Sequence, residues 1–437
     1  MNTFFERNRK GERALLVMPY ARSDGDARRR AQEFTDLAKS AGAQVLESIG
    51  ARVDAPNPRF YIGSGKADEV LERVRMLDAD LVLVDHALTP VQERNLEKHL
   101  GVRVVDRAGL ILDIFAQRAR SHEGKLEVEL AQLKHMATRL VRGWTHLERQ
   151  RGGAIGLRGP GETQLETDRR LLGERVKQLQ KRLDKVGVQR GQQRRARLRN
   201  TLPRVALVGY TNAGKSTLFN AMAQGRAYAA DQLFATLDPT VHRLEGLGSG
   251  PAVLADTVGF IRELPHDLIA AFRATLAEAR DADLLLHVVD AADPERDELI
   301  GIVDEVLREI GAGEVPQLLV FNKIDLLNGS MSGQSHINRD SEGSLSRVWV
   351  SAATGEGLDL LREAIGERLS GARVQAEVRL PPEAGRLRAK LIELGAVADE
   401  RYDEQGWTLA IDAPRAMLAP LIGEFRGNSG LLEALLH

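Results

Sequence analysis

The sequence has no cysteine, few aromatic residues and almost no net charge. Without cysteine, disulfide bonds, cysteine-bound metals and thiol nucleophiles are excluded, and the composition suits a reducing cytosol. The 61 basic and 62 acidic side chains leave a formal charge of −1, so the chain is not a polycation. Binding to a nucleic acid would therefore have to come from local basic patches.

The chain also lacks long apolar runs. Its first twenty residues contain no apolar core of the kind found in signal peptides. No stretch approaches the roughly 18 apolar residues that a membrane-crossing helix requires. We therefore expect a monomeric, cytoplasmic protein without a membrane span, and partial association with a membrane surface stays open.

The 437 residues are enough for about three domains. Short runs rich in Val and Leu at 13–20, 81–88 and 102–106 alternate with helix-like stretches at 26–41 and 90–99. Strands that alternate with helices predict a largely parallel sheet. We place an N-terminal α/β domain at 1–115.

The next segment carries apolar residues at the spacing of helices that pack side by side. These residues are Leu126, Leu130, Leu133, Ala137 and Leu140 in a first series, and Leu172, Val176, Leu179, Leu183 and Val186 in a second. A glycine-rich stretch at 151–162 lies between the two series. The pattern predicts a long antiparallel helical hairpin at 116–200.

The predicted tip of this hairpin carries Arg151 and Arg158, which are candidate RNA contacts. A simple helix connection would need fewer glycines. The second arm ends in a basic stretch at 190–199, which could contact RNA phosphates or could form a solvated helix face.

From Pro203 the chain alternates again, with apolar strands expected at 204–208, 252–255, 284–289 and 317–321. We place a second α/β domain at 203–370. Residues 328–346 are polar and rich in Gly and Ser, which indicates a mobile surface insertion.

A small C-terminal α+β domain is expected at 372–437, with a strand at 374–380, a helix near 383–395 and a hairpin around Gly406. The predicted fold class is thus multidomain α/β. It combines an N-terminal α/β domain, a long antiparallel helical hairpin, a P-loop domain with a mixed sheet and helices on both faces, and this last domain.

Residues 209–216 read G-Y-T-N-A-G-K-S, the full phosphate-loop motif, and they stand between an expected strand and an expected helix. Backbone N–H groups of such a loop point at phosphates. Lys215 is expected to reach the β- and γ-phosphates, and the Ser216 hydroxyl to bind Mg²⁺.

Two further motifs complete the site. Residues 256–259, D-T-V-G, follow a strand, so Asp256 can hold Mg²⁺ through water and the Gly259 amide can approach the γ-phosphate. Residues 322–325, N-K-I-D, place Asp325 where its oxygens match the N1–H and N2–H₂ donors of guanine, which adenine lacks. A site built around such a partner rejects ligands without it by roughly 10⁴-fold or more. Ser351, Ala352 and Ala353 can contact guanine O6 by backbone N–H.

The threonine of the first switch that binds Mg²⁺ must lie between Lys215 and Asp256. Thr236 and Thr240 both qualify, and Thr236 is favoured; either could instead cap a strand. The residues proposed for catalysis are Lys215, Thr236 and Gly259. The residues proposed to bind GTP are Gly209, Tyr210, Thr211, Asn212, Ala213, Gly214, Lys215, Ser216, Thr217, Phe234, Ala235, Thr236, Leu237, Asp238, Asp256, Thr257, Val258, Gly259, Asn322, Lys323, Ile324, Asp325, Ser351, Ala352 and Ala353.

The order and spacing of these motifs are specific to translation-factor-like GTPases. Residues 109–133, 158–170 and 234–240 closely resemble the HflX family of ribosome-associated bacterial GTPases, in its proteobacterial branch. The resemblance covers about residues 5 to 425, and it is weaker in the C-terminal tail.

The resemblance implies GTP and GDP as ligands, Mg²⁺ as cofactor and the large ribosomal subunit with its rRNA as partner. It also implies GTP hydrolysis that the ribosome stimulates, and the splitting of stalled ribosomes into subunits, notably under heat stress. In this family the N-terminal region is thought to reach the rRNA around the peptidyl-transferase centre.

Many small GTPases orient the attacking water with a Gln after D-x-x-G, but this chain has Phe260 there. Slow intrinsic turnover, completed by a partner, is expected unless another switch residue acts alone. Asn212 stands where some GTPases hold K⁺, which would offset transition-state charge; it could instead stabilise the loop.

Two alternatives to ribosome splitting stay open. One is a GTP-gated RNA-binding module whose hydrolysis only times its release. The other is ATP-dependent RNA remodelling by the N-terminal domain, where 62-IGSGK-66 resembles a fragment of a phosphate loop. That fragment lacks the full spacing, and a turn before a helix at 66–77 accounts for it equally well.

Overall fold

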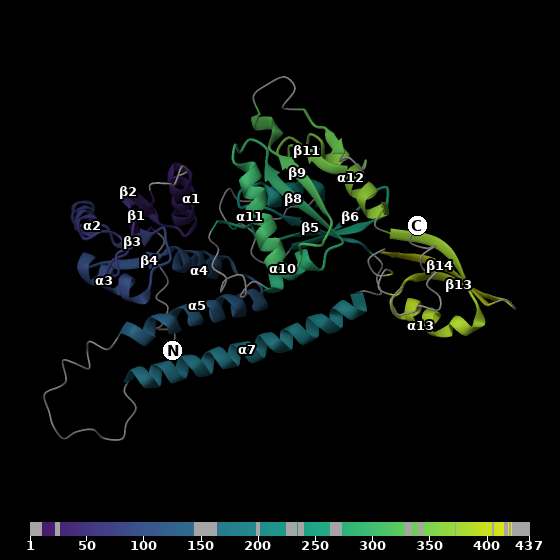
Figure 1. The fold of residues 1–437 in the computed structure, drawn as a ribbon, viewed down its shortest axis with the longest axis horizontal. Coiled ribbons are helices and arrows are strands. Elements are labelled where there is room, and N and C mark those ends of the chain that lie inside the picture. The colour runs from purple at the N-terminus through teal and green to yellow at the C-terminus, as the bar shows by residue number, and fades with distance from the viewer. Residues whose placement is uncertain are drawn as a thin grey trace. The chain divides into compact units, whose positions relative to one another are not determined.

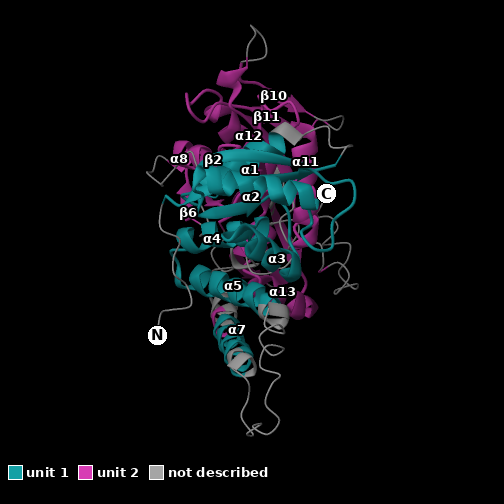
Figure 2. Cartoon of the chain, turned by 90° about the vertical axis from the view of Figure 1, so that its left-hand side faces the viewer, with its two compact units in different colours: residues 1–184, 231–237, 263–272 teal, residues 185–230, 238–262, 273–437 magenta. Residues whose placement is uncertain are grey.

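The computed structural model describes residues 11–21, 27–143, 164–197, 202–223, 234, 240–262, 273–327, 334–339, 343, 345–371, 373–403, 406–414, 418 and 421. The chain divides into two compact units, coloured in Figure 2. Unit 1 comprises 1–184, 231–237 and 263–272, and unit 2 comprises the remainder. No helix in the described part of the chain is long and apolar enough to cross a membrane.

Unit 1 contains a four-stranded sheet in the order β2-β1-β3-β4, with every pair parallel (Figure 1). Its strands are β1 (Arg13–Tyr20), β2 (Gln44–Arg52), β3 (Leu81–Val84) and β4 (Arg103–Asp106). The helices that connect and follow them are α1 (Ala27–Ser40), α2 (Ser64–Leu77), α3 (Pro90–Leu100) and α4 (Arg107–Arg118). The predicted parallel α/β arrangement is confirmed.

Strand β2 was not predicted from the sequence. It lies at the edge of the sheet, and polar residues such as Glu47, Ser48 and Arg52 interrupt its apolar pattern. An edge strand pairs on one side only, so its sequence needs less continuous hydrophobicity than a central strand such as β3.

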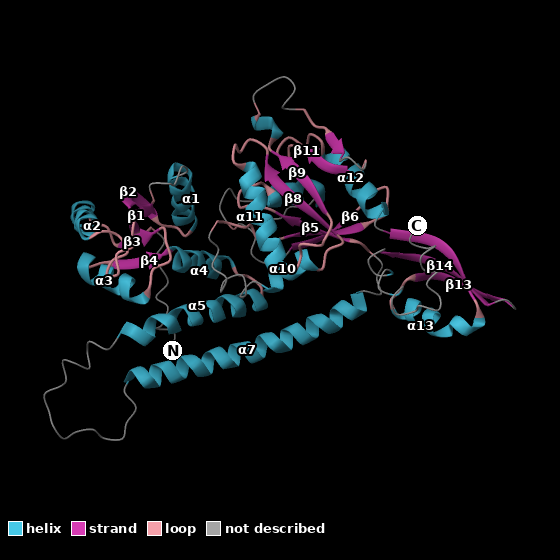
Figure 3. Ribbon diagram, in the orientation of Figure 1, coloured by secondary structure: helices cyan, strands magenta, loops and turns pink. Residues whose placement is uncertain are grey.

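Two helices follow the first sheet, namely α5 (His122–Gly143) and α7 (Gln164–Arg197), and they run side by side (Figure 3). Seven of the ten apolar residues in the two predicted series form one cluster, namely Leu126, Leu130, Leu133, Leu172, Val176, Leu179 and Leu183. The stretch from 144 to 163, with Arg151 and Arg158, lies outside the described residues.

Hydrogen bonds between charged side chains connect α5 to α3 and to the end of β4. Arg139 donates from Nε to Glu93 over 2.5 Å and from Nη2 to Asp106 over 2.8 Å. Asp106 also accepts from the amide of Gly109 and so caps the start of α4. Burial raises the pKa of Glu93 to about 7, although the guanidinium of Arg139 opposes the shift.

Unit 2 contains a seven-stranded mixed sheet in the order β10-β11-β9-β8-β5-β7-β6. Its strands are β5 (Arg204–Val208), β6 (Thr240–Leu244), β7 (Ala252–Asp256), β8 (Leu284–Asp290), β9 (Gln317–Asn322), β10 (Ile337–Arg339) and β11 (Leu345–Trp349). Only β6 and β10, at its two edges, are antiparallel to their neighbours. The helices of this part are α8 (Lys215–Ala223), α10 (Arg273–Arg280), α11 (Arg296–Glu309) and α12 (Leu358–Gly371), with a 3-10 turn at Ile324–Leu326.

The prediction of a mobile insertion at 328–346 is wrong for its described residues. Residues 337–339 form β10 and pair with β11. Trp349 stacks on Phe321 with ring centroids 4.4 Å apart, and His336 stacks on Trp349 at 5.1 Å. The indole of Trp349 also donates to Asn338 over 3.0 Å. Aromatic stacking thus stabilises a strand whose polar sequence gave no strand signal.

The last part of the chain forms a three-stranded antiparallel sheet in the order β12-β14-β13. Its elements are β12 (Arg373–Leu380), a 3-10 turn at Pro382–Ala384, α13 (Gly385–Glu393), β13 (Val397–Asp403) and β14 (Gly406–Pro414). Gly406 has φ of 124° and a Cβ there would lie 2.1 Å from the carbonyl oxygen of Leu380, so only glycine fits the predicted hairpin.

Candidate nucleotide site

The phosphate loop joins the end of β5 to α8, which begins at Lys215. Two of its glycines are required by contacts with neighbouring strands. A Cβ on Gly209 would lie 2.2 Å from the carbonyl oxygen of Val288, and a Cβ on Gly214 would lie 2.2 Å from Nδ2 of Asn322. Asn212 has φ of 62°, in the left-handed region. The motif therefore folds into a tight loop that ends at a helix N-terminus, the arrangement that binds phosphates.

Lys215 is buried at the start of α8. Its Nζ donates to the carbonyl oxygens of Gly209, over 3.0 Å, and Tyr210, over 2.7 Å. Burial lowers the pKa of this ammonium to about 8, and the nearby carboxylate of Asp256 opposes the shift. The positive charge therefore lies inside the loop, where a phosphate would offset its desolvation.

Ser216 and Asp256 lie together beside the loop. The Ser216 hydroxyl donates to Oδ2 of Asp256 over 2.7 Å. Asp256 is buried at the end of β7, and the Thr257 hydroxyl donates to the carbonyl of Leu207 in β5 over 2.6 Å. A hydroxyl and a carboxylate next to a phosphate loop are hard oxygen donors of the kind that Mg²⁺ prefers.

Asn322, at the end of β9, connects the phosphate loop to the loop after β11. Its Nδ2 donates to the carbonyl of Ala213 over 3.0 Å, and its Oδ1 accepts from the amide of Ala352 over 2.9 Å. The buried amide of Asn322 therefore fixes two loops that come from opposite ends of the domain sequence.

Asp325 and Ser351 are also brought together. The Ser351 hydroxyl donates to Oδ1 of Asp325 over 2.6 Å and accepts from the amide of Thr354 over 3.1 Å. This orients the carboxylate of Asp325 at the edge where the sequence predicts the guanine base. Ile324, Ala352 and Ala353 belong to the same two loops.

One residue of this edge was not predicted. Asp290, the last residue of β8, forms an ion pair of 2.7 Å with Nζ of Lys323. Lys323 has φ of 66°, so the ion pair stabilises a backbone conformation that L-residues seldom adopt. The signal in the sequence was an Asp directly after an apolar strand, at the carboxyl edge of a mostly parallel sheet.

The residues after D-T-V-G also contact the phosphate loop. Phe260 is only 1% exposed and forms a backbone bridge with Tyr210. A buried phenyl ring cannot orient water by hydrogen bonding.

Phe234 is the one described residue of the predicted segment 234–238. Its ring is 3% exposed and packs edge-on against Phe115 of α4, with centroids 4.6 Å apart, so the side chain is used in the core of unit 1. Ala235, Thr236, Leu237 and Asp238 lie outside the described residues. Thr240, the other candidate threonine, is exposed at the start of β6.

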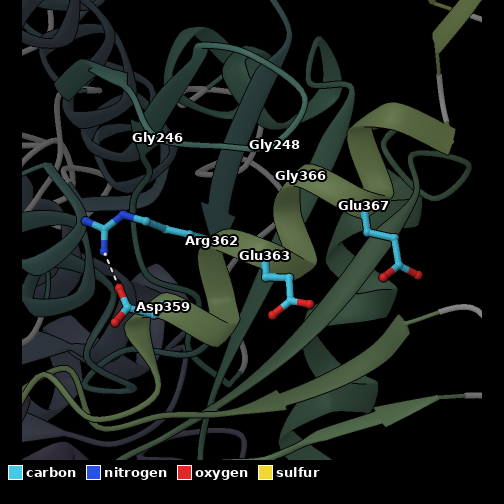
Figure 4. Close-up of a pocket in the computed structure, with 7 residues that line it drawn as sticks. All are labelled: Gly246, Gly248, Asp359, Arg362, Glu363, Gly366 and Glu367. Atoms are coloured by element: carbon cyan, nitrogen blue, oxygen red, sulfur yellow. Dashed lines mark ion pairs between the residues drawn. The ribbon is translucent and has the colours of Figure 1, made fainter.

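Two other features lie outside this site. Helix α2 begins at Ser64 with Gly63 as its N-cap, so the last three residues of 62-IGSGK-66 are the first residues of the helix, which starts two residues earlier than predicted. A cavity of about 550 Å³ lies beside α12 and is lined by Gly246, Gly248, Asp359, Arg362, Glu363, Gly366 and Glu367 (Figure 4). Arg362 pairs with Asp359 there at 3.6 Å. None of the predicted nucleotide residues lines this cavity.

Family models match most of the chain. The "GTP-binding GTPase N-terminal" model matches 28–116, the "GTP-binding GTPase Middle Region" model 118–197, the "50S ribosome-binding GTPase" model 204–323 and the "HflX C-terminal domain" model 336–416.

Among named proteins, the chain is 58% identical over 402 residues to GTPase HflX of Escherichia coli, covering 92% of this chain and 93% of that one. It is 44% identical over 423 residues to GTPase HflX of Magnetococcus marinus, covering 96% of each. Among solved structures, a GTP-binding protein from Sulfolobus solfataricus in complex with GDP aligns over 82% of this chain and 99% of that one, with 24% identity and a TM-score of 0.45.

Proposed function

Because the chain belongs to the HflX family of GTPases, we propose that it binds the large ribosomal subunit and uses GTP binding and hydrolysis to split stalled ribosomes into subunits, notably under heat stress. The observation that carries this proposal is the match of residues 204–323 to a ribosome-binding GTPase model, a range that contains the phosphate loop, Asp256 and Asn322. A ribosomal partner would place the protein in the cytoplasm.

In this proposal each loop has one task. The phosphate-loop amides and Lys215 bind the β- and γ-phosphates. Gly259 presents its amide to the γ-phosphate, and the carboxylate of Asp325 accepts from guanine N1–H and N2–H₂. The hydrogen bonds of Asn322 to both Ala213 and Ala352 support this proposal, because they hold the phosphate loop and the proposed base-binding loop in a fixed arrangement.

Ser216 and Thr236 are the proposed Mg²⁺ ligands, and Asp256 would act on the ion through water. The contact between Ser216 and Asp256 fits this assignment. When bound, Mg²⁺ would neutralise charge that develops on the β- and γ-phosphate oxygens. K⁺ near Asn212 would act in the same sense, and equal turnover in Na⁺ and K⁺ buffers would remove it from the proposal.

The buried ring of Phe260 supports a partner-completed active site, since Phe260 directly follows Gly259 and its phenyl ring offers no hydrogen bond to water. We expect slow turnover by the protein alone and faster turnover on the ribosome. Arg151 and Arg158 of the hairpin connection are the proposed rRNA contacts, through phosphate binding.

The experiment is the steady-state rate of GTP hydrolysis with and without purified large ribosomal subunits, with small subunits as the matched control. Stimulation of about tenfold or more by large subunits only is expected, a modest part of what partner-supplied groups can contribute. Equal rates in all three conditions would contradict the ribosome as activator. Splitting of 70S particles is then followed by sedimentation with GTP and with a non-hydrolysable analogue.

A further inference from the structure

The segment that follows D-T-V-G lies against the phosphate loop through backbone hydrogen bonds. The amide of Phe260 donates to the carbonyl of Gly209 over 3.1 Å, and the amide of Thr211 donates to the carbonyl of Phe260 over 2.7 Å. These two bonds extend the pairing of β5 with β7 into the phosphate loop. The segment after D-T-V-G is therefore hydrogen-bonded directly to the phosphate loop. We call this arrangement closed.

This closure leaves little room beside Gly259. A Cβ on Gly259 would lie 2.8 Å from Cγ2 of Thr211 and 3.0 Å from Nζ of Lys215. The backbone of Gly259 thus packs directly on the ammonium that binds the γ-phosphate in this kind of site. A phosphate oxygen lies about 2.8 Å from each donor, so binding of a γ-phosphate between Lys215 and the amide of Gly259 is expected to move the two apart.

Tyr210 and Arg262 hold the closed segment in place, and we call this pair of residues the clasp. The hydroxyl of Tyr210 accepts from the amide of Arg262 over 2.8 Å. The guanidinium of Arg262 in turn pairs with Glu295 at 2.8 Å and with Glu298 at 3.3 Å, at the start of α11. Arg262 is thereby tied at its backbone to the phosphate loop and at its side chain to a helix of the same domain.

From these contacts we propose that Tyr210 and Arg262 are positioning residues that select between GDP and GTP. While no γ-phosphate is bound, the clasp holds Gly259 and Phe260 on the phosphate loop, and the γ-phosphate of GTP must open it to reach Lys215. Part of the binding free energy of the γ-phosphate is then used to move this segment. The proposal concerns the isolated GTPase, so it stands or falls apart from the ribosomal partner.

The first test is Tyr210→Phe, which removes the hydroxyl and keeps the ring. Dissociation constants for GDP and for a non-hydrolysable GTP analogue are measured by competition with a fluorescent nucleotide. We expect the analogue to bind about two- to tenfold more tightly, the worth of one hydrogen bond, with GDP affinity unchanged or weaker. Tyr402→Phe, at an exposed tyrosine of β13, is the matched control and should change neither constant.

The second test is Glu295→Gln, which weakens the ion pair of Arg262 and leaves the nucleotide contacts in place. The same rise in the ratio of analogue to GDP affinity is expected, together with a lower KM for GTP. Asp403→Asn is its control, because the exposed pair of Asp403 with Arg379 lies in the C-terminal sheet.

A purely structural role predicts a different result. It would lower the thermal stability and change both nucleotide affinities by the same factor. An unchanged ratio in both variants, or a ratio that falls, would overturn the proposal.

Discussion

At the scale of the residue, the carboxylate of Asp325 is the group that we propose to distinguish guanine from other bases. We predict that Asp325→Asn lowers GTP affinity by about 100-fold, because an NH₂ group then faces a guanine donor. The same variant should gain affinity for a xanthine nucleotide, whose C2 carbonyl accepts from that NH₂ group.

Competitive binding of GTP, ATP and XTP measures the change of preference. Asp359→Asn, at an exposed aspartate of α12, serves as the control. A variant that still prefers GTP over XTP would contradict the assignment of Asp325.

His287 gives a second prediction at this scale. It is buried on β8, and burial holds its pKa well below the usual 6.5, although Asp304 at 3.7 Å opposes the shift. The folded protein keeps His287 neutral while the unfolded chain takes up a proton below pH 6.5. The free energy of unfolding should therefore fall with decreasing pH below 6.5, by up to about 1.4 kcal/mol per pH unit from this site.

Urea unfolding across about pH 5 to 7.5, the range in which histidine titrates, measures this slope. His287→Gln should flatten it, whereas His242→Gln, at an exposed histidine of β6, should leave it unchanged. Equal slopes in the wild type and in the His287 variant would show that the site does not contribute.

The sequence predicted the residues that belong to a motif much better than the residues that hold those motifs in place. The spacing of G-x-x-x-x-G-K-S located the loop, because backbone geometry dictates its glycines. Asp290 and Arg262 pair with residues that are distant in the chain; Asp290 at least stands at the end of an apolar run, whereas no local pattern indicates Arg262. The roles of the nucleotide residues themselves stay predictions that the binding measurements address.

At the scale of the element, the packing of α5 on α7 depends on the fully buried Leu179. Leu179→Ala should reduce the free energy of unfolding of the unit that contains it by about 2–5 kcal/mol through lost burial and a cavity. Leu171→Ala, on the same helix but 52% exposed, should change it by at most about 0.5 kcal/mol. Chemical denaturation followed by circular dichroism compares the two, and similar losses would mean that the helices do not pack through this face.

Central strands and long helices were predicted well, as were the edge strands β4 and β12, whereas the edge strands β2, β6 and β10 were not. Strands such as β5 and β8 are continuous apolar runs because both of their faces are covered. The edge strands β2, β6 and β10 carry polar side chains, so hydrophobic periodicity underestimates them. For β10 the stabilising contact is a ring stack across strands, which a linear pattern does not encode.

At the scale of the whole molecule, the two compact units predict separable responses to ligand. GDP at 100 times its dissociation constant should stabilise the unit that holds the phosphate loop by about 2.7 kcal/mol and leave the other transition in place. Differential scanning calorimetry with GDP, and with ATP as the control, tests this. If a single unfolding transition is seen and its midpoint rises with GDP, the two units unfold together and the prediction is wrong.

The stack of His336, Trp349 and Phe321 has a spectroscopic consequence. Trp349 is one of three tryptophans in the chain, and its partner Phe321 directly precedes Asn322. Trp407 lies in the C-terminal sheet, beneath the guanidinium of Arg388. With Trp144 and Trp407 both replaced by Phe, Trp349 is the one tryptophan left, and its emission would report on the loop that carries Asn322 and Asp325, so that nucleotide exchange could be followed in real time on the unlabelled protein.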